Sequence, residues 1–420
     1  MAVLDIKEKL SGFRRKREEE STEENPKVIR LRRIEEEQEE EAKKFLFLPA
    51  DETTTKLLIT LLIALVAAVL GFWFYNRVHT YDEYAIKTSI EKNDIDGTGY
   101  LMLGNSLLKY SPDGVFCVDL QNHTKWSTAY SMQTPICARC KNTVVIAEQQ
   151  GQQVYLFQAD GEVGHFETTL PIRQACVAAN GVVALVLQDQ DTAWIMLYGS
   201  DGSQIASVKA SMDISGYPMN VAITDNAKKM AVSYLCLAEG DLTGRIVFYD
   251  FSSASDNDEA HQTGSADFAR EVFPRIYFAD RSTLVAVGDC SMEIFHDTRK
   301  PADRTSVAFD REIVSFFCDE YNEGFIFRSQ DSQQLYDMEV YNIRGKRVMQ
   351  TSFGFEYTGV RMENAEILLY DAVNLYAYRT SGKQKLSLTY EKPVEYFALL
   401  SGYHRYLVIT EETMDQIRIM

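Results

Sequence analysis

Residues 99–130 read GYLMLGNSLLKYSPDGVFCVDLQNHTKWSTAY. Four short apolar runs alternate here with small or turn-forming residues, most clearly at Asp113-Gly114. Val, Tyr, Phe and Trp favour strands because their side chains pack well on a pleated surface. Gly, Pro, Asn and Asp instead adopt the backbone angles of tight turns. The stretch therefore predicts four consecutive strands joined by tight turns.

The same pattern of four runs recurs to the end of the sequence, with a period of about 40 residues. Eight copies begin close to Gly99, Thr134, Arg173, Tyr217, Pro274, Ile313, Tyr357 and Val394. Four-stranded units repeated around an axis form a β-propeller, which leaves only short strand edges exposed. We therefore predict an all-β fold over 97–420, a β-propeller of eight four-stranded blades. A seven-bladed propeller is the first alternative, and a β-sandwich array or a non-repeating β protein is the second.

Glycines mark the expected hairpins between the third and fourth runs of a copy. They follow a polar residue at Asp160-Gly161, Asp201-Gly202, Arg344-Gly345 and Ser381-Gly382. A two-residue hairpin requires positive φ angles, which glycine adopts without a steric penalty. These pairs favour one common register for the copies.

The eighth copy stops before its fourth strand. Residues 82–91, DEYAIKTSIE, precede the first copy and have the composition of a strand. We predict that residues 84–90 form the outer strand of the last blade and close the ring. Residues 77–96 are then a linker that contains the ring-closing strand.

A second feature of the sequence is an uncharged run at 57–75, LLITLLIALVAAVLGFWFY, of 19 residues. At about 1.5 Å per helical residue, this run approaches the thickness of a bilayer core of about 30 Å. We predict a single transmembrane helix at 56–76, preceded by a charged tail at 1–55 that is partly disordered or helical. A cleaved signal peptide is the competing interpretation, but its apolar stretch would lie much closer to the N-terminus.

Basic residues are unequally distributed around this run. Lys43, Lys44 and Lys56 precede it, whereas Arg77 and then Lys87 follow it. Lys and Arg are enriched on the cytoplasmic side of a membrane span. We expect a single-pass protein of the cytoplasmic membrane, with a cytoplasmic N-terminus and an extracytoplasmic propeller.

The charge balance bears on the partners. The chain has 61 acidic and 43 basic residues, a net charge of −18. Nucleic-acid binding needs a basic surface, so we expect no nucleic-acid partner.

The seven cysteines include one Cys-x-x-Cys motif, Cys137 and Cys140. Positions three apart on a strand face opposite sides, so we interpret both as core thiols, with a redox pair and a metal site as alternatives. An extracytoplasmic domain without a disulfide framework points to a bacterial envelope.

Recognisable catalytic motifs are absent from the sequence. It contains no G-x-S-x-G, H-E-x-x-H, P-loop or G-x-G-x-x-G motif. We therefore assign no catalytic, cofactor-binding or metal-binding residue and leave the binding residues unknown.

The first copy carries a resemblance to a known family. The segment DGVFCVDL at 113–120, followed by Lys125-Trp126, resembles the repeat of quinoprotein-like propellers, the PQQ-like and WD40-like group. The resemblance implies a propeller; quinone binding is not expected, because the adjacent Cys-Cys pair of the quinoprotein dehydrogenases is missing. The order of tail, span and propeller also resembles an uncharacterised family of membrane-anchored propeller proteins of Gram-positive bacteria.

Non-enzymatic propellers of this kind serve as envelope assembly scaffolds. We accordingly expect a non-catalytic interaction scaffold at the bacterial cell envelope, with the membrane and envelope proteins as partners. A ligand sensor that signals through the cytoplasmic tail and an envelope carbohydrate-active enzyme are the alternatives.

Overall fold

The computed structural model describes residues 52–190, 192–211, 215–238, 240–252 and 261–420. The chain divides into Met1–Arg77 and a compact unit, Val78–Met420. Helix α3 covers Glu52–Val78, whereas most of the predicted tail at 1–55 lies outside the described residues. In the described part of the chain, no helix is long and apolar enough to cross a membrane. Helix α3 agrees with the predicted helix at 56–76. That this helix crosses a membrane remains a prediction.

The compact unit consists of eight antiparallel four-stranded sheets, the blades. Blade 1 contains β2 (Gly99–Leu103), β3 (Ser106–Ser111), β4 (Gly114–Val118) and β5 (Thr124–Ala129). Blade 2 contains β6 (Pro135–Cys140), β7 (Thr143–Glu148), β8 (Gln153–Gln158) and β9 (Gly161–Glu167). Blade 3 contains β10 (Ile172–Val177), β11 (Val183–Asp189), β12 (Thr192–Tyr198) and β13 (Gln204–Ser211). Blade 4 contains β14 (Tyr217–Ile223), β15 (Lys229–Ala238), β16 (Asp241–Asp250) and β17 (Gln262–Ala269).

The remaining four blades repeat this order, except for the last. Blade 5 contains β18 (Arg275–Phe278), β19 (Leu284–Val287), β20 (Ser291–Phe295) and β21 (Arg304–Ala308). Blade 6 contains β22 (Ile313–Cys318), β23 (Asn322–Arg328), β24 (Tyr336–Asn342) and β25 (Arg347–Phe353). Blade 7 contains β26 (Gly359–Glu363), β27 (Glu366–Tyr370), β28 (Asn374–Arg379) and β29 (Gln384–Thr389). Blade 8 contains β30 (Val394–Leu399), β31 (Arg405–Thr410), β32 (Thr413–Ile419) and, from the other end of the unit, β1 (Tyr84–Glu91).

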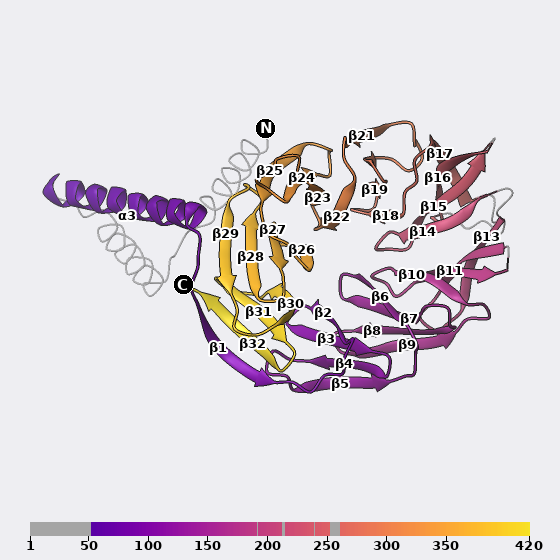
Figure 1. The fold of residues 1–420 in the computed structure, drawn as a ribbon, viewed down its shortest axis with the longest axis horizontal. Helices are drawn as coiled ribbons and strands as arrows, with labels where there is room; N and C mark the ends of the chain where they lie inside the picture. Colours follow the sequence, from indigo (N-terminus) through magenta and orange to yellow (C-terminus); the bar gives the residue numbers. More distant parts are fainter. Residues whose placement is uncertain (1–51, 191, 212–214, 239, 253–260) are drawn as a thin grey trace, which may run out of the picture. The chain divides into compact units, whose positions relative to one another are not determined.

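The blades are arranged around a centre, and each has its first repeat strand innermost (Figure 1). Consecutive innermost strands contact one another, for example β6 with β10 and β14 with β18. Each is also the edge strand of its sheet, hydrogen-bonded to a sheet neighbour on one side only. We call these eight strands the inner strands and the space that they enclose the central channel. The inner strands are β2, β6, β10, β14, β18, β22, β26 and β30.

The ring closes in blade 8. Strand β1 pairs with β32 in antiparallel register, from Tyr84 opposite Ile419 to Glu91 opposite Thr413. Upstream of β1, the buried Tyr81 forms a parallel bridge with Leu386 of β29. The structure therefore confirms the eight-bladed propeller and the predicted pairing of residues 84–90.

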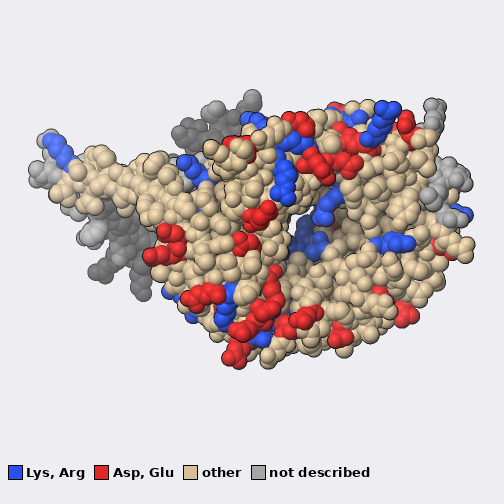
Figure 2. Space-filling model, in the orientation of Figure 1, with Lys and Arg blue, Asp and Glu red and all other residues tan. Residues whose placement is uncertain are grey.

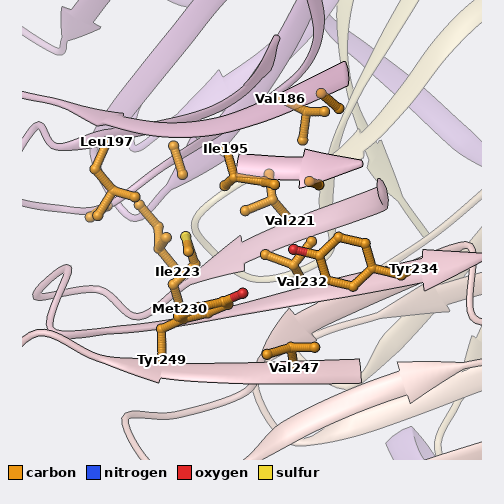
Figure 3. Close-up of a cluster of buried hydrophobic side chains, with 14 residues drawn as sticks. Val186, Ile195, Leu197, Val221, Ile223, Met230, Val232, Tyr234, Val247 and Tyr249 are labelled. Atoms are coloured by element: carbon orange, nitrogen blue, oxygen red, sulfur yellow. The ribbon is translucent and has the colours of Figure 1, made fainter. Parts of the chain in front are cut away.

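The core is a series of apolar layers between neighbouring blades. In β7, Val144 and Ile146 pack with residues of blade 1, whereas Val145 and Ala147 pack with residues of blade 3. This alternation follows from the period of two along a strand. Figure 3 shows one such layer, in which residues of blade 3 meet residues of blade 4. Blade 2 is thus held between two apolar layers, one shared with blade 1 and one shared with blade 3.

The predicted hairpin glycines have the expected backbone conformation. The φ angle is +79° at Gly202 and +74° at Gly345, and it is also positive at Gly161 and Gly382. A side chain at these positions would strain the backbone, because L-residues rarely adopt such angles. The turn chemistry that was read from the sequence is therefore confirmed.

Candidate binding site in the central channel

The inner strands carry a basic set of charges, although the whole chain has a net charge of −18. They contain four arginines and two glutamates: Arg139 on β6, Arg173 on β10, Arg275 on β18, Arg361 and Glu363 on β26, and Glu395 on β30. Figure 2 shows Lys and Arg side chains around the central opening. The wall of the channel is thus locally basic on an acidic protein.

Two of these arginines reach from one inner strand to the next. Arg139 Nη1 donates a hydrogen bond to the carbonyl oxygen of Met102 on β2, at 2.5 Å. The guanidinium carbon of Arg275 lies 5.8 Å from the ring centre of Phe316 on β22. Both partners of each contact lie on inner strands, so the guanidinium groups lie along the channel wall.

Arg361 makes a similar contact and also has a counter-charge. Its guanidinium carbon lies 4.0 Å from the ring centre of Tyr396 on β30, and its Nη1 lies 3.4 Å from a carboxylate oxygen of Glu363. The other inner-strand carboxylate, Glu395, lies 2.6 Å from Lys92 Nζ. Both inner-strand glutamates are therefore neutralised by cations of the protein itself.

The remaining arginines lack such a counter-charge. Among the described residues, Arg139, Arg173 and Arg275 form no ion pair with a carboxylate. Arg173 also makes no hydrogen bond or ring contact in that part of the chain, and it lies at a β-bulge between Ile172 and Gln174. Three arginines thus lie on inner strands without a compensating carboxylate among the described residues.

A cavity of about 300 Å³ opens where blades 7, 8 and 1 meet. Its lining is formed by Ile95, Gly97, Thr98, Tyr100, Thr358, Tyr370, Val394 and Glu395. The Tyr370 hydroxyl donates a hydrogen bond to the carbonyl oxygen of Glu395, at 3.1 Å. Gly359 pairs with Tyr370 in register, and a Cβ atom at that glycine would overlap the tyrosine ring. The glycine therefore allows this ring to lie beside the cavity.

A buried polar network supports this cavity. Lys92 Nζ donates hydrogen bonds to the Tyr100 hydroxyl and to Glu395, each at 2.6 Å. Asp94 accepts hydrogen bonds from Lys109 Nζ at 2.9 Å and from the Tyr100 hydroxyl at 3.1 Å. Burial, with the nearby carboxylates of Asp94 and Glu395, raises the pKa of Tyr100 far above its usual range. The network connects the segment after β1 to blades 1 and 8.

The other end of the channel is bridged by an ion cluster. The turns after inner strands β6, β14 and β18 contribute Lys141, Asp225 and Arg281. Asp225 lies 2.5 Å from Lys141 Nζ and 2.7 Å from Arg281 Nε. Hydrogen bonds from Arg281 and Lys141 lower the pKa of Asp225 to about 2. Blades 2, 4 and 5 are thereby joined at one end, which shows that these inner strands run in the same direction.

Comparison with known proteins assigns a family to this architecture. The family model of DUF5711, described as a family of unknown function, matches residues 77–419. The chain belongs to the DUF5711 family. No curated protein matches this member of the family.

Solved structures resemble this DUF5711 chain in fold. BamB from Moraxella catarrhalis is 11% identical, with a TM-score of 0.50, covering 80% of this chain and 100% of its own. A structure described as the eukaryotic initiation factor is 10% identical, with a TM-score of 0.50, covering 81% and 90%. The Neurospora crassa Pan2 WD40 domain is 10% identical, with a TM-score of 0.40, covering 68% and 87%. The likeness to the first two, each with a TM-score of 0.50, shows a β-propeller fold and nothing further.

The two cysteines of the Cys-x-x-Cys motif lie on opposite faces of β6. Cys137 packs with the apolar layer toward blade 1, and Cys140 packs with the layer toward blade 3. Both are free thiols, and burial raises the pKa of Cys137 to about 12. Among the described residues, no group of three or more His, Cys, Asp or Glu could hold a metal ion. The placement of the two cysteines agrees with core thiols.

Sequence reasoning left the binding residues unassigned, although a signal was present. Four of the eight copies have an arginine in their first run, at Arg139, Arg173, Arg275 and Arg361. The sequence does not show whether the first or the fourth run lies at the centre. Only the assembled ring places these arginines on one channel wall.

Proposed function

We propose that this DUF5711 chain is a non-catalytic β-propeller that acts as an interaction scaffold at the bacterial cell envelope. The proposal rests on which charged side chains of the channel are paired with an opposite charge and which are not. Glu363 and Glu395 are each engaged by a cation, which disfavours their use as acid or base catalysts. The unpaired guanidinium groups of Arg139, Arg173 and Arg275 instead form a surface suited to binding.

The proposal includes attachment to the cytoplasmic membrane through residues 56–76. This part rests on the uncharged run at 57–75. In α3, the consecutive residues Leu57, Leu58 and Ile59 are 64, 62 and 51% exposed. Successive helical residues point in directions about 100° apart, so apolar groups face outward on several sides. Contiguous exposed apolar surface of this kind marks contact with a membrane or a partner.

The excess of Lys and Arg before the proposed span supports a cytoplasmic tail and an external propeller. Alkaline carbonate extraction of native membranes tests the attachment. We expect the full-length chain to stay in the membrane pellet, as an integral protein does. Release into the supernatant would exclude the anchor while leaving the binding function to be tested separately.

Capture of partners from crosslinked native membranes tests the scaffold. The full-length chain is compared with a chain lacking residues 1–44. We expect both chains to recover the same envelope proteins, because the proposed binding surface lies in the propeller. Loss of these proteins together with the tail would favour a cytoplasmic docking or sensor function. Recovery of no specific protein by either chain would argue against the scaffold.

A further inference from the structure

We propose that the central channel binds an extended acidic polypeptide segment, whose carboxylates pair with Arg139, Arg173 and Arg275. This inference deepens the proposed scaffold function, because it names the chemistry of the partner. Its starting point is the set of three guanidinium groups that no carboxylate of the described chain neutralises. Arginine binds carboxylates through a planar fork of donors, and such charge-assisted bonds are stronger than neutral ones.

The arginines are distributed along the channel, which favours an extended ligand. Arg275 is the first residue of β18, whereas Arg139 is the fifth of the six residues of β6. The turns that follow both strands meet at Asp225, so both strands end at the same end of the channel. Arg139 lies one residue and Arg275 three residues before the end of its strand, so at about 3.3 Å per residue their Cα atoms differ in height by about 7 Å. A chain with several carboxylates can pair with arginines at different heights, whereas a single small anion offers one binding group.

The backbone of the channel wall favours a peptide over another polyanion. Each inner strand is an edge strand, with hydrogen-bonding groups directed away from its sheet. Some of these carbonyl groups already accept hydrogen bonds from side chains, as Met102 does from Arg139 and Met219 from Gln174. An extended peptide supplies N–H donors for such carbonyls, whereas a polyphosphate has none. The wall thus offers partners for both the side chains and the backbone of a peptide.

The charge of the rest of the protein directs the ligand to the channel. With a net charge of −18, the outer surface repels an acidic segment on average. A basic opening surrounded by acidic surface concentrates the attractive potential at one place. Figure 2 shows Lys and Arg around the opening, with Asp and Glu also near it, so the proposed attraction rests on the charges of the inner strands. Electrostatic repulsion elsewhere therefore adds specificity for the channel.

Binding of fluorescein-labelled hexaglutamate to the full-length chain in a non-ionic detergent tests the inference. Fluorescence anisotropy at low ionic strength gives the Kd. We expect saturable binding that weakens as salt is raised, because salt screens charge interactions. Arg173→Gln should weaken binding about tenfold, the effect of one charge-assisted contact. The triple variant R139Q/R173Q/R275Q should lose binding.

The control has the same change of net charge outside the inner strands. Arg270, Arg299 and Arg328 are exposed and lie on none of the inner strands. The triple variant R270Q/R299Q/R328Q should bind hexaglutamate with a Kd within about twofold of that of the natural chain. Such a difference in binding free energy is smaller than the contribution of one hydrogen bond. Equal losses in the two triple variants would show that binding depends on net charge, which would overturn the channel site.

Folding of the variants is checked by thermal unfolding. Arg173 has no polar or ring contact with other described residues, so R173Q remains informative if the triple variant is unstable. No hexaglutamate binding by the natural chain would overturn the inference, and binding of tripolyphosphate alone would replace the peptide with a phosphate ligand. Capture of envelope proteins without hexaglutamate binding would reject this inference and leave the scaffold standing. If partner capture and hexaglutamate binding both fail, the scaffold function and the acidic-peptide site are both rejected.

Discussion

Tyr84 of β1 and Ile419 of β32 are register partners, so one blade combines the two ends of the propeller. The outer strand of this blade precedes all other strands, and the remaining three follow them. Closure by pairing of the ends makes the stability of the ring depend on a segment of eight residues.

Removal of residues 82–91 should therefore destabilise the whole ring. The deletion leaves β32 without its outer partner and exposes part of the core of blade 8. We expect the thermal midpoint of the full chain to fall by on the order of 10 °C. Lys87→Ala, at an exposed position of β1, is the control and should change the midpoint little. Equal midpoints for the deletion and the control would show that β1 does not close the ring.

A buried carboxyl group should make stability dependent on pH. Glu323 on β23 is completely buried and hydrogen-bonded to the Tyr277 hydroxyl, and its Oε1 has no partner among the described residues. Burial raises the pKa of Glu323 from 4.5 to about 8. The folded state therefore holds this proton more tightly than the unfolded state. The resulting stabilisation is complete below about pH 4.5 and is lost as the pH rises through about 8.

Glu323→Gln tests this pH dependence, because glutamine keeps the shape and does not ionise. We expect the variant to be more stable than the natural chain at pH 9, by on the order of a few kcal/mol. The difference should shrink toward pH 5, where the natural carboxyl group is protonated. Urea unfolding at pH 5, 7 and 9 measures the effect. A difference that is constant with pH would mean that Glu323 does not titrate in this range.

The buried network behind the cavity should contribute more stability than the exposed ion cluster at the opposite end. Lys109 is almost completely buried and donates hydrogen bonds to Asp94 and Asn122, both at 2.9 Å. Lys109→Met leaves Asp94 with less compensation in a buried place, so we expect a loss of about 3 kcal/mol in urea unfolding. Lys141→Met, which removes an exposed partner of Asp225, is the matched control and should have little effect. A larger loss of stability in Lys141→Met than in Lys109→Met would contradict the burial of Lys109.

The cysteines should differ strongly in reactivity toward iodoacetamide at pH 8. Cys290 is exposed, whereas Cys137 is held in its protonated form by a pKa of about 12. The thiolate is the reactive species, so we expect fast labelling of Cys290 and labelling of Cys137 only after unfolding. Mass spectrometry of peptides gives both rates. A disulfide between Cys137 and Cys140 in the native protein would instead support a redox pair.

Much of the fold could be predicted because its signals are local. Alternating apolar residues and glycines such as Gly202 and Gly345 define strands and hairpins within a few residues. The missing strand of the eighth copy left one vacancy, and residues 84–90 were the segment available to fill it. The membrane span at 56–76 remains a prediction, since its basis is the composition of the run.

The sequence by itself determined the repeat and predicted a ring-closing strand at 84–90, because both depend on periodicity or on turn residues. The eight sheets of the structure decided between eight and seven blades. Only the tertiary structure decided which runs face the channel and which charges remain unpaired. Arg361 lies beside Glu363 on its own strand, whereas Arg173 meets no carboxylate among the described residues. Lys92 and Glu395 are far apart in the chain and meet only when blade 8 closes. Charge pairing depends on distances between strands, and these distances exist only in the assembled ring.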